Sequence, residues 1–194
     1  MGKKFLTSLT ILSLAFSGQV GLSTSASAAA PATLVTFESA DPTPYFLGAF
    51  PEGSKKGDFE GATSSLENAP AGGSSGNTKA AKFIKGGAAW SGTTFLNFGG
   101  SSTTVVSTGK TTITMNVYAP AAGTYVRLKA ENAGDPTVSV ETSSTTSTVA
   151  GWQTLTFNFL TQATGTAAFN AASTYNMLNI FPDWNPTGNT YTAG

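Results

Sequence analysis

The chain has 194 residues, with ten basic and ten acidic side chains and neither histidine nor cysteine. These absences exclude Ser-His-Asp triads, thiol nucleophiles, histidine metal sites and disulfide bonds. The charged fraction is only 10% and no basic patch is present, which argues against electrostatic binding to nucleic acid. The many Gly, Ser and Thr residues are typical of extracellular all-β modules rather than helical cytoplasmic enzymes.

The N-terminal segment has the three parts of a secretory signal peptide. Two lysines give a basic start, residues 5–16 form an apolar run, and Ala26-Ser27-Ala28 supplies small residues for a signal peptidase. The apolar run is too short to span a membrane. We therefore expect residues 1–28 to be removed, residues 29–194 to fold as one domain, and the protein to be secreted without a membrane partner.

The first half of the mature chain predicts three strands around a long irregular region. Residues 34–38 read as a strand that ends before the Asp-Pro-Thr-Pro run at 41–44. Residues 45–77 predict loops packed on the core with one short strand, and long loops of this kind often carry function. Residues 79–85 and 93–98 then predict two further strands, separated by glycine-containing breaks.

Residues 111–118 and 124–131 alternate apolar and polar side chains, which predicts two half-buried antiparallel strands joined by a turn. We expect the core to receive Ile113, Met115, Val117, Val126, Leu128 and Ala130. The opposite face of the second stretch carries Tyr125, Arg127, Lys129 and Glu131. A row of hydrogen-bonding side chains beside an aromatic ring suits a polar ligand. An ordinary ion-pair ladder is the alternative for Lys129 and Glu131.

The rest of the chain completes an all-β pattern. Residues 136–141, 152–159 and 175–181 predict strands, and the second of these alternates cleanly, with Leu155 and Phe157 inward. About eight short strands with Gly- and Pro-rich breaks favour a β-sandwich, most simply a jelly roll. After residue 181 the sequence reads as a loop leading to a strand that does not follow, so we expect the closing C-terminal strand to be lacking.

Several motifs occur in an order that resembles a known group of proteins. They are Phe37-Glu38, residues 82–92 (KFIKGGAAWSG), residues 117–120 (VYAP) with 126–131 (VRLKAE), and residues 151–157 (GWQTLTF). Together they resemble exported bacterial β-sandwich modules of carbohydrate-binding type, of the kind attached to laminarinase-like glycosidases. The resemblance implies a module that binds a polysaccharide, with a β-glucan as the first choice. We expect the module to be a monomer. Such modules often hold one structural calcium ion near the first and last strands.

Glu38 and Asp41 are the natural ligands for that calcium ion, because calcium prefers carboxylate and carbonyl oxygens. The alternative for Glu38 is a strand cap that accepts backbone N–H bonds. No two acids form a Glu-x-x-x-Glu motif on one strand, where they could flank a glycosidic bond, so we expect no catalysis. A small lyase or hydrolase with a less obvious acid pair, and a structural or adhesive module without sugar binding, are the competing hypotheses.

Sugar binding needs an aromatic platform for the apolar face of a pyranose and partners for its hydroxyl groups. Trp184, expected in a loop beside Asp183, is the first platform candidate, with a loop anchor as the alternative. Trp90 lies between glycine-containing breaks and is equally suited to packing or to ligand contact. Tyr45 follows a proline in a loop and is expected to lie at the rim of the same groove, next to Arg127 and its neighbours on the strand.

Overall fold

A computed structural model describes the backbone of residues 7–14 and 32–33, and both backbone and side chains of residues 35–38, 45–48, 57–73, 78–100 and 102–184. Throughout these ranges the regular elements are β-strands. None of the described residues belongs to a helix that could cross a membrane. The prediction of an all-β fold is confirmed.

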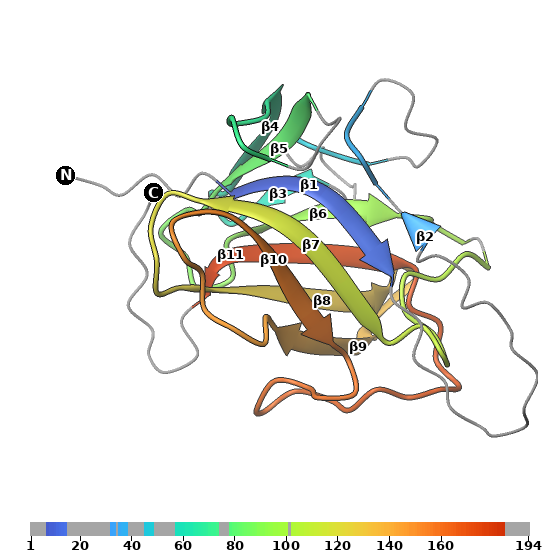
Figure 1. Ribbon diagram of the computed structural model, residues 1–194. Coiled ribbons are helices and arrows are strands. Elements are labelled where there is room, and N and C mark those ends of the chain that lie inside the picture. Colours follow the sequence, from blue (N-terminus) through green and yellow to red (C-terminus); the bar gives the residue numbers. More distant parts are fainter. Residues whose placement is uncertain are drawn as a thin grey trace, which may run out of the picture.

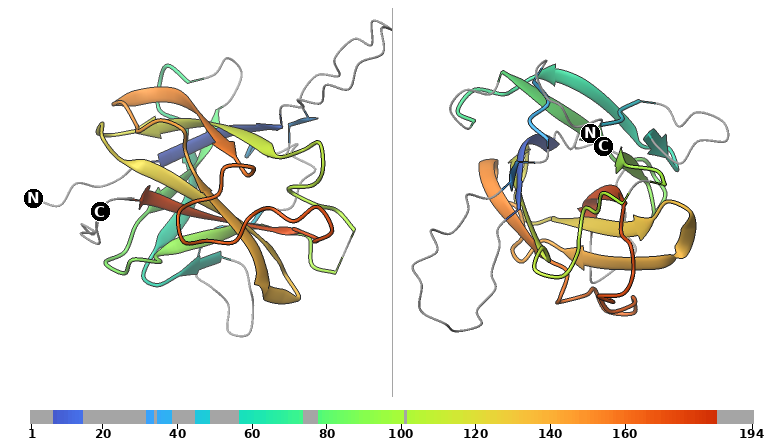
Figure 2. Two further views of the ribbon diagram at one scale, coloured as in Figure 1. Left: turned by 90° about the horizontal axis from the view of Figure 1, so that it is seen from below. Right: turned by 90° about the vertical axis from the view of Figure 1, so that its right-hand side faces the viewer.

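The strands form two antiparallel sheets that lie face to face (Figures 1 and 2). The first sheet has the order β10 (Gly151–Asn158), β7 (Thr112–Ala119), β1 (Thr7–Leu14), β5 (Lys79–Ile84) and β4 (Thr63–Asn68), with β2 (Ala32–Thr33) paired to β1. The second sheet has the order β3 (Gly57–Phe59), β6 (Gly92–Asn97), β11 (Met177–Trp184), β8 (Tyr125–Asn132) and β9 (Asp135–Ser143). The architecture is a β-sandwich, as predicted; jelly-roll connectivity stays a prediction.

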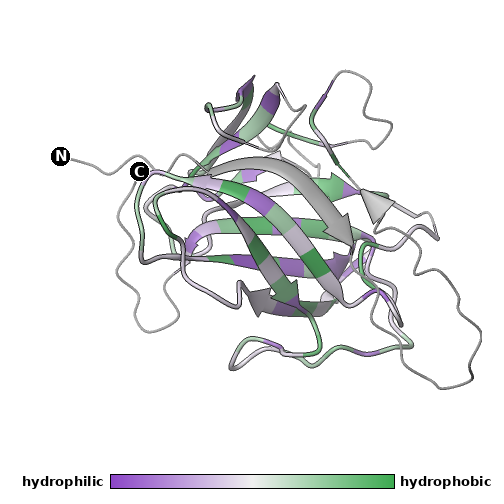
Figure 3. Cartoon of the chain, in the orientation of Figure 1, coloured by the Kyte–Doolittle hydropathy of each residue, from purple (hydrophilic) through white to green (hydrophobic). Residues whose placement is uncertain are grey.

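The core lies between the two sheets, and β5, β7, β8, β10 and β11 contribute alternate residues to it (Figure 3). All six apolar residues predicted to face inward from β7 and β8 are fully buried, and so are Leu155 and Phe157 of β10. The alternation of apolar and polar residues therefore predicted the core-facing sides of these strands correctly, because successive side chains of a strand point to opposite sides of a sheet. The polar row of β8, which consists of Tyr125, Arg127, Lys129 and Glu131, consequently faces away from the core.

Strand β1 comes from the segment that the sequence assigns to a signal peptide. It pairs with β7 along one edge and with β5 along the other, so it joins the two halves of the first sheet. β5 and β7 have no direct pairing with each other in the strand order. A chain cleaved after Ala28 would no longer contain β1, and its first sheet would have a gap at this point.

The prediction of a first strand at residues 34–38 is wrong for residues 35–38, the part of this segment that the structure describes, because they do not form a strand. Val35 and Phe37 are buried in the core, but Phe37 has a φ of 65°, which interrupts an extended backbone. The long region predicted to be mostly loop contains two strands, β3 and β4. β4 was missed because most of its side chains are exposed and polar, so it carries little apolar periodicity.

Candidate functional site

A pocket of about 370 Å³ lies on the outer face of the second sheet. This volume is in the usual range for small-molecule sites. Its lining comes from four neighbouring strands and two adjoining loop residues: Phe59, Glu60, Trp90, Thr94, Lys129, Glu131, Met177, Asn179 and Phe181. The pocket thus brings together three of the residues predicted from sequence, Trp90, Lys129 and Glu131.

Trp90 supplies the exposed aromatic surface at this pocket. Its ring makes an edge contact with Phe181, with centroids 5.6 Å apart, and a tilted contact with Trp184, with centroids 4.9 Å apart. Even so, 47% of Trp90 remains exposed. Large aromatic residues usually bury most of their area, so an indole fixed from one side and open on the other is suited to contact a ligand.

Trp184 is not in a loop, as the sequence predicted, but is the last residue of β11. Only 6% of it is exposed, and the guanidinium carbon of Arg127 lies 3.9 Å from the centre of its ring, a cation–π contact. A register shift between Phe181 and Trp184 accompanies the positive φ of Asp183, 50°. The indole therefore lies against Arg127 and Trp90, and these contacts contribute to its burial.

The polar row of β8 forms ion pairs within the sheet. Lys129 Nζ lies 2.6 Å from Glu131 Oε2, and Arg127 Nη1 lies 3.4 Å from Glu141 Oε2 of β9. Lys129 and Glu131 thus form the ion pair that the alternative predicted, and both also line the pocket, so their part in ligand binding stays a prediction. Burial raises the pKa of the Glu141 carboxyl group, and this effect is partly offset by the nearby charges of Arg127 and Lys129.

Two buried polar side chains complete the inner part of the pocket. Thr94 of β6 donates a hydrogen bond to Asn179 Oδ1, and Asn179 Nδ2 is 3.5 Å from the carbonyl oxygen of Lys129. These contacts link β6, β11 and β8 side by side. Their polar groups are therefore held in place before any ligand arrives.

The loop that carries Trp90 is held by a buried lysine. Lys85 Nζ donates to the carbonyl oxygens of Ala89, at 3.0 Å, and Ser91, at 3.3 Å. Ser91 in turn accepts a bond from the Gly86 backbone N–H at 2.6 Å. Burial lowers the pKa of Lys85 to about 8, and the charge of Asp183 offsets part of this effect.

This lowered pKa predicts that Lys85 makes the fold more stable as the solution becomes more alkaline. The unfolded lysine titrates near 10.5, so between pH 8 and 10.5 the unfolded state binds more protons than the folded state. The free energy of unfolding should rise across this window and level off above it. Urea denaturation at pH 7, 8.5 and 10 should show the wild type gaining stability relative to Lys85→Met; equal pH dependence of both proteins would contradict the assignment.

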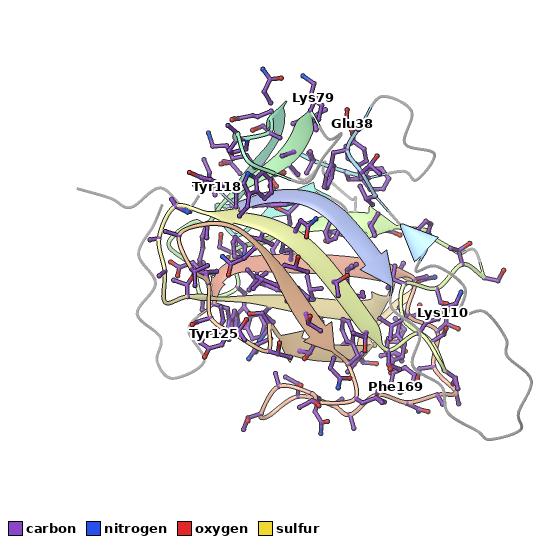
Figure 4. The ribbon with its side chains drawn as sticks, in the orientation of Figure 1. Glu38, Lys79, Lys110, Tyr118, Tyr125 and Phe169 are labelled. Atoms are coloured by element: carbon purple, nitrogen blue, oxygen red, sulfur yellow. The ribbon has the colours of Figure 1, made fainter. Side chains whose placement is uncertain are left out.

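Tyr45, Tyr125 and Asp183 were predicted at the site but do not line the pocket. The ring of Tyr45 packs against Phe37, with centroids 4.9 Å apart, next to the core. Tyr125 is half-buried at the start of β8 (Figure 4). It pairs in register with Trp184 of β11. Asp183 lies beside Lys85 at the irregular end of β11.

Glu38 acts as the strand cap that was the alternative to a calcium ligand. Its Oε1 accepts backbone N–H bonds from Thr78 at 2.7 Å and Lys79 at 2.8 Å, and its Oε2 accepts the Thr78 hydroxyl at 2.9 Å (Figure 4). These bonds lower the pKa of Glu38. Within the described residues no three acidic side chains gather as a metal site. Asp41 lies outside the described residues, and the calcium ion stays a prediction.

Sequence reasoning missed the parts of the site that come from β6 and β11. Asn179 carried a detectable signal, because it is an amide within the otherwise apolar run Met177–Phe181 and is 4% exposed. A buried polar side chain in such a run needs a partner, which here is Thr94. Nothing local marks Phe59 or Thr94 as pocket residues.

No family model, curated protein or solved structure matches this chain. A proposal about function therefore rests on the geometry of the pocket and on the sequence itself.

Proposed function

We propose that this chain is a secreted, non-catalytic, monomeric β-sandwich module that binds a polysaccharide, with a β-glucan as the first candidate. The observation that carries the proposal is the pocket in which the exposed ring of Trp90 stands beside Lys129 and Glu131. The pattern of motifs that resembles exported carbohydrate-binding modules supplies the glycan class. The N-terminal sequence supports export.

The side chains of the pocket match the two surfaces of a pyranose ring. The C–H face of the sugar is apolar and can stack on the Trp90 indole, with Phe59 and Phe181 adding apolar wall. The hydroxyl groups can accept from the Lys129 ammonium and donate to the Glu131 carboxylate. A pocket that is mostly apolar, with a few fixed polar groups, is the usual form of a small-molecule site.

Binding without hydrolysis is favoured by the way that two acids are engaged: Glu131, which lines the pocket, and Glu141, which lies opposite Lys129 on β9. A glycosidase needs a protonated carboxyl group at the glycosidic oxygen and a second carboxylate across the bond. Glu131 is instead held by the Lys129 ammonium at 2.6 Å. Glu141, whose pKa is raised by burial, is paired with Arg127. These acids are suited to orient hydroxyl groups rather than to transfer protons.

Affinity electrophoresis with Trp90→Ala tests the proposal. We expect the wild type to be retarded in gels that contain laminarin and the variant to bind roughly tenfold or more weakly, because it loses the area that stacks on the sugar. Leu160→Ala is the matched control, since Leu160 is also an exposed apolar residue, 63% accessible, and does not line the pocket. Normal mobility of the folded wild type in laminarin, xylan and mannan gels would instead favour a structural module.

A further inference from the structure

We propose that the pocket selects uncharged glycans over acidic ones, and that Glu131 and Glu141 are the residues that set this preference. The inference rests on the proposed function and deepens it by naming the substrate class. It follows from how four charges are arranged on β8 and β9: Lys129 and Glu131 line the pocket, and Arg127 and Glu141 are next to them on the same face of the sheet.

The register of the two strands places opposite charges next to each other. Lys129 stands directly across from Glu141, and it contacts Glu131, two residues further along its own strand, at 2.6 Å. Arg127 reaches diagonally to Glu141 at 3.4 Å and also stacks on Trp184. Two cations and two anions thus alternate over this part of the sheet, and their charges cancel.

Each cation of this group is already engaged by a carboxylate that lies at or beside the pocket. The side chains of Arg127, Glu141 and Glu131 are each only 9% exposed, so water screens the group weakly. The other charged groups nearby offer no alternative: Glu60 at the rim is itself acidic, and Lys85 donates to the carbonyl oxygens of its own loop.

An acidic sugar placed here would bring its carboxylate or sulfate close to Glu131 and Glu141 and would have to compete with them for Lys129 and Arg127. Like charges brought together in a weakly screened site repel each other strongly. A neutral sugar avoids this cost, since its hydroxyl groups both donate and accept and can fit between the paired charges without separating them. The arrangement of charges therefore favours the binding of neutral glycans.

A pair of polymers with the same backbone tests this directly: laminarin, and laminarin that has been carboxymethylated. In affinity electrophoresis at low salt, we expect the wild type to bind the neutral polymer at least tenfold more tightly. Glu131→Gln/Glu141→Gln leaves the two cations without their carboxylates, so its affinity for the carboxymethylated polymer should rise at least tenfold and fall again as salt is added. For Glu131→Gln alone, the affinity for the carboxymethylated polymer should rise by a smaller factor, because this variant keeps the Arg127–Glu141 pair intact.

Glu67→Gln is the matched control, because it makes the same change of charge at an ion pair with Lys82 on the first sheet. Equal retention of the wild type by both polymers, or glutamine variants with an unchanged preference, would overturn the selectivity while leaving polysaccharide binding in place. A folded wild type retained by neither of these polymers, nor by xylan or mannan, would overturn the proposed function and this inference with it.

Discussion

A chain that begins at residue 29 is expected to unfold at a much lower urea concentration than the full chain. Strand β1 pairs with three positions of β5 and five of β7, and all of these pairings are lost when residues 1–28 are removed. At about 1 kcal/mol for each net hydrogen bond, the loss is on the order of 5 kcal/mol or more. That is comparable with the whole stability of a typical domain.

The gap left by β1 is too wide for β5 and β7 to pair across without rearrangement. They are separated by two strand spacings, about 9.5 Å, while a hydrogen-bonded pair needs one. Ala81 and Phe83 of β5 face the same core as Met115 and Val117 of β7. Their burial therefore also depends on the strand between them.

Urea denaturation of the two chains, with their masses checked, measures this effect. A synthetic peptide of residues 5–16, added in excess to the shorter chain, should restore part of the lost stability, and a peptide of scrambled sequence should not. Equal unfolding midpoints for the long and short chains would show that the sheet closes without β1.

The same experiment bears on the proposal of export, because one segment cannot be both a cleaved signal and a permanent strand. If the secreted protein begins at residue 29, its first sheet has two open edges at β5 and β7 until another strand pairs with them. Unpaired edges of this kind invite pairing with further chains. The mass of the secreted protein thus decides which state of the sheet is the working one.

The sequence was sufficient to predict the faces of the long regular strands. In β7, in β8 and from Thr154 onward in β10 the apolar and polar residues alternate, and the core-facing and outward sides of these strands follow from this pattern. For the same reason the sequence alone predicts that the polar side chains from Arg127 to Glu131 lie on the outward face of a sheet. The pocket was predictable to that extent.

The neighbours of that row could not be predicted, because they depend on which strands lie side by side. β11 pairs with β8 although about fifty residues separate Asn179 from Lys129, and β6 is more distant still along the chain. Local patterns contain no information about such pairing. Glu38 is a similar case, since its partners Thr78 and Lys79 are about forty residues away.

Replacing Trp184 by alanine is expected to destabilise the fold by about 3–5 kcal/mol, the usual cost of removing a buried tryptophan. Sequence reasoning took Pro182 and Asp183 as signs of a loop, but they lie within β11 at a register shift, where proline and a positive φ are tolerated. The indole is consequently covered by Arg127 on one side and contacted by Trp90 on another.

Trp184→Ala and Trp90→Ala should therefore differ in what they impair. The Trp184 variant should lose stability in urea and lose glycan binding only as far as the support of Trp90 and Arg127 is lost, whereas Trp184→Phe should retain part of both. The Trp90 variant should lose binding and keep its stability within about 1 kcal/mol, because nearly half of the surface of Trp90 is exposed. If Trp184→Ala were as stable as the wild type yet failed to bind, the buried indole would have to be the ligand platform, and the assignment of that role to Trp90 would be wrong.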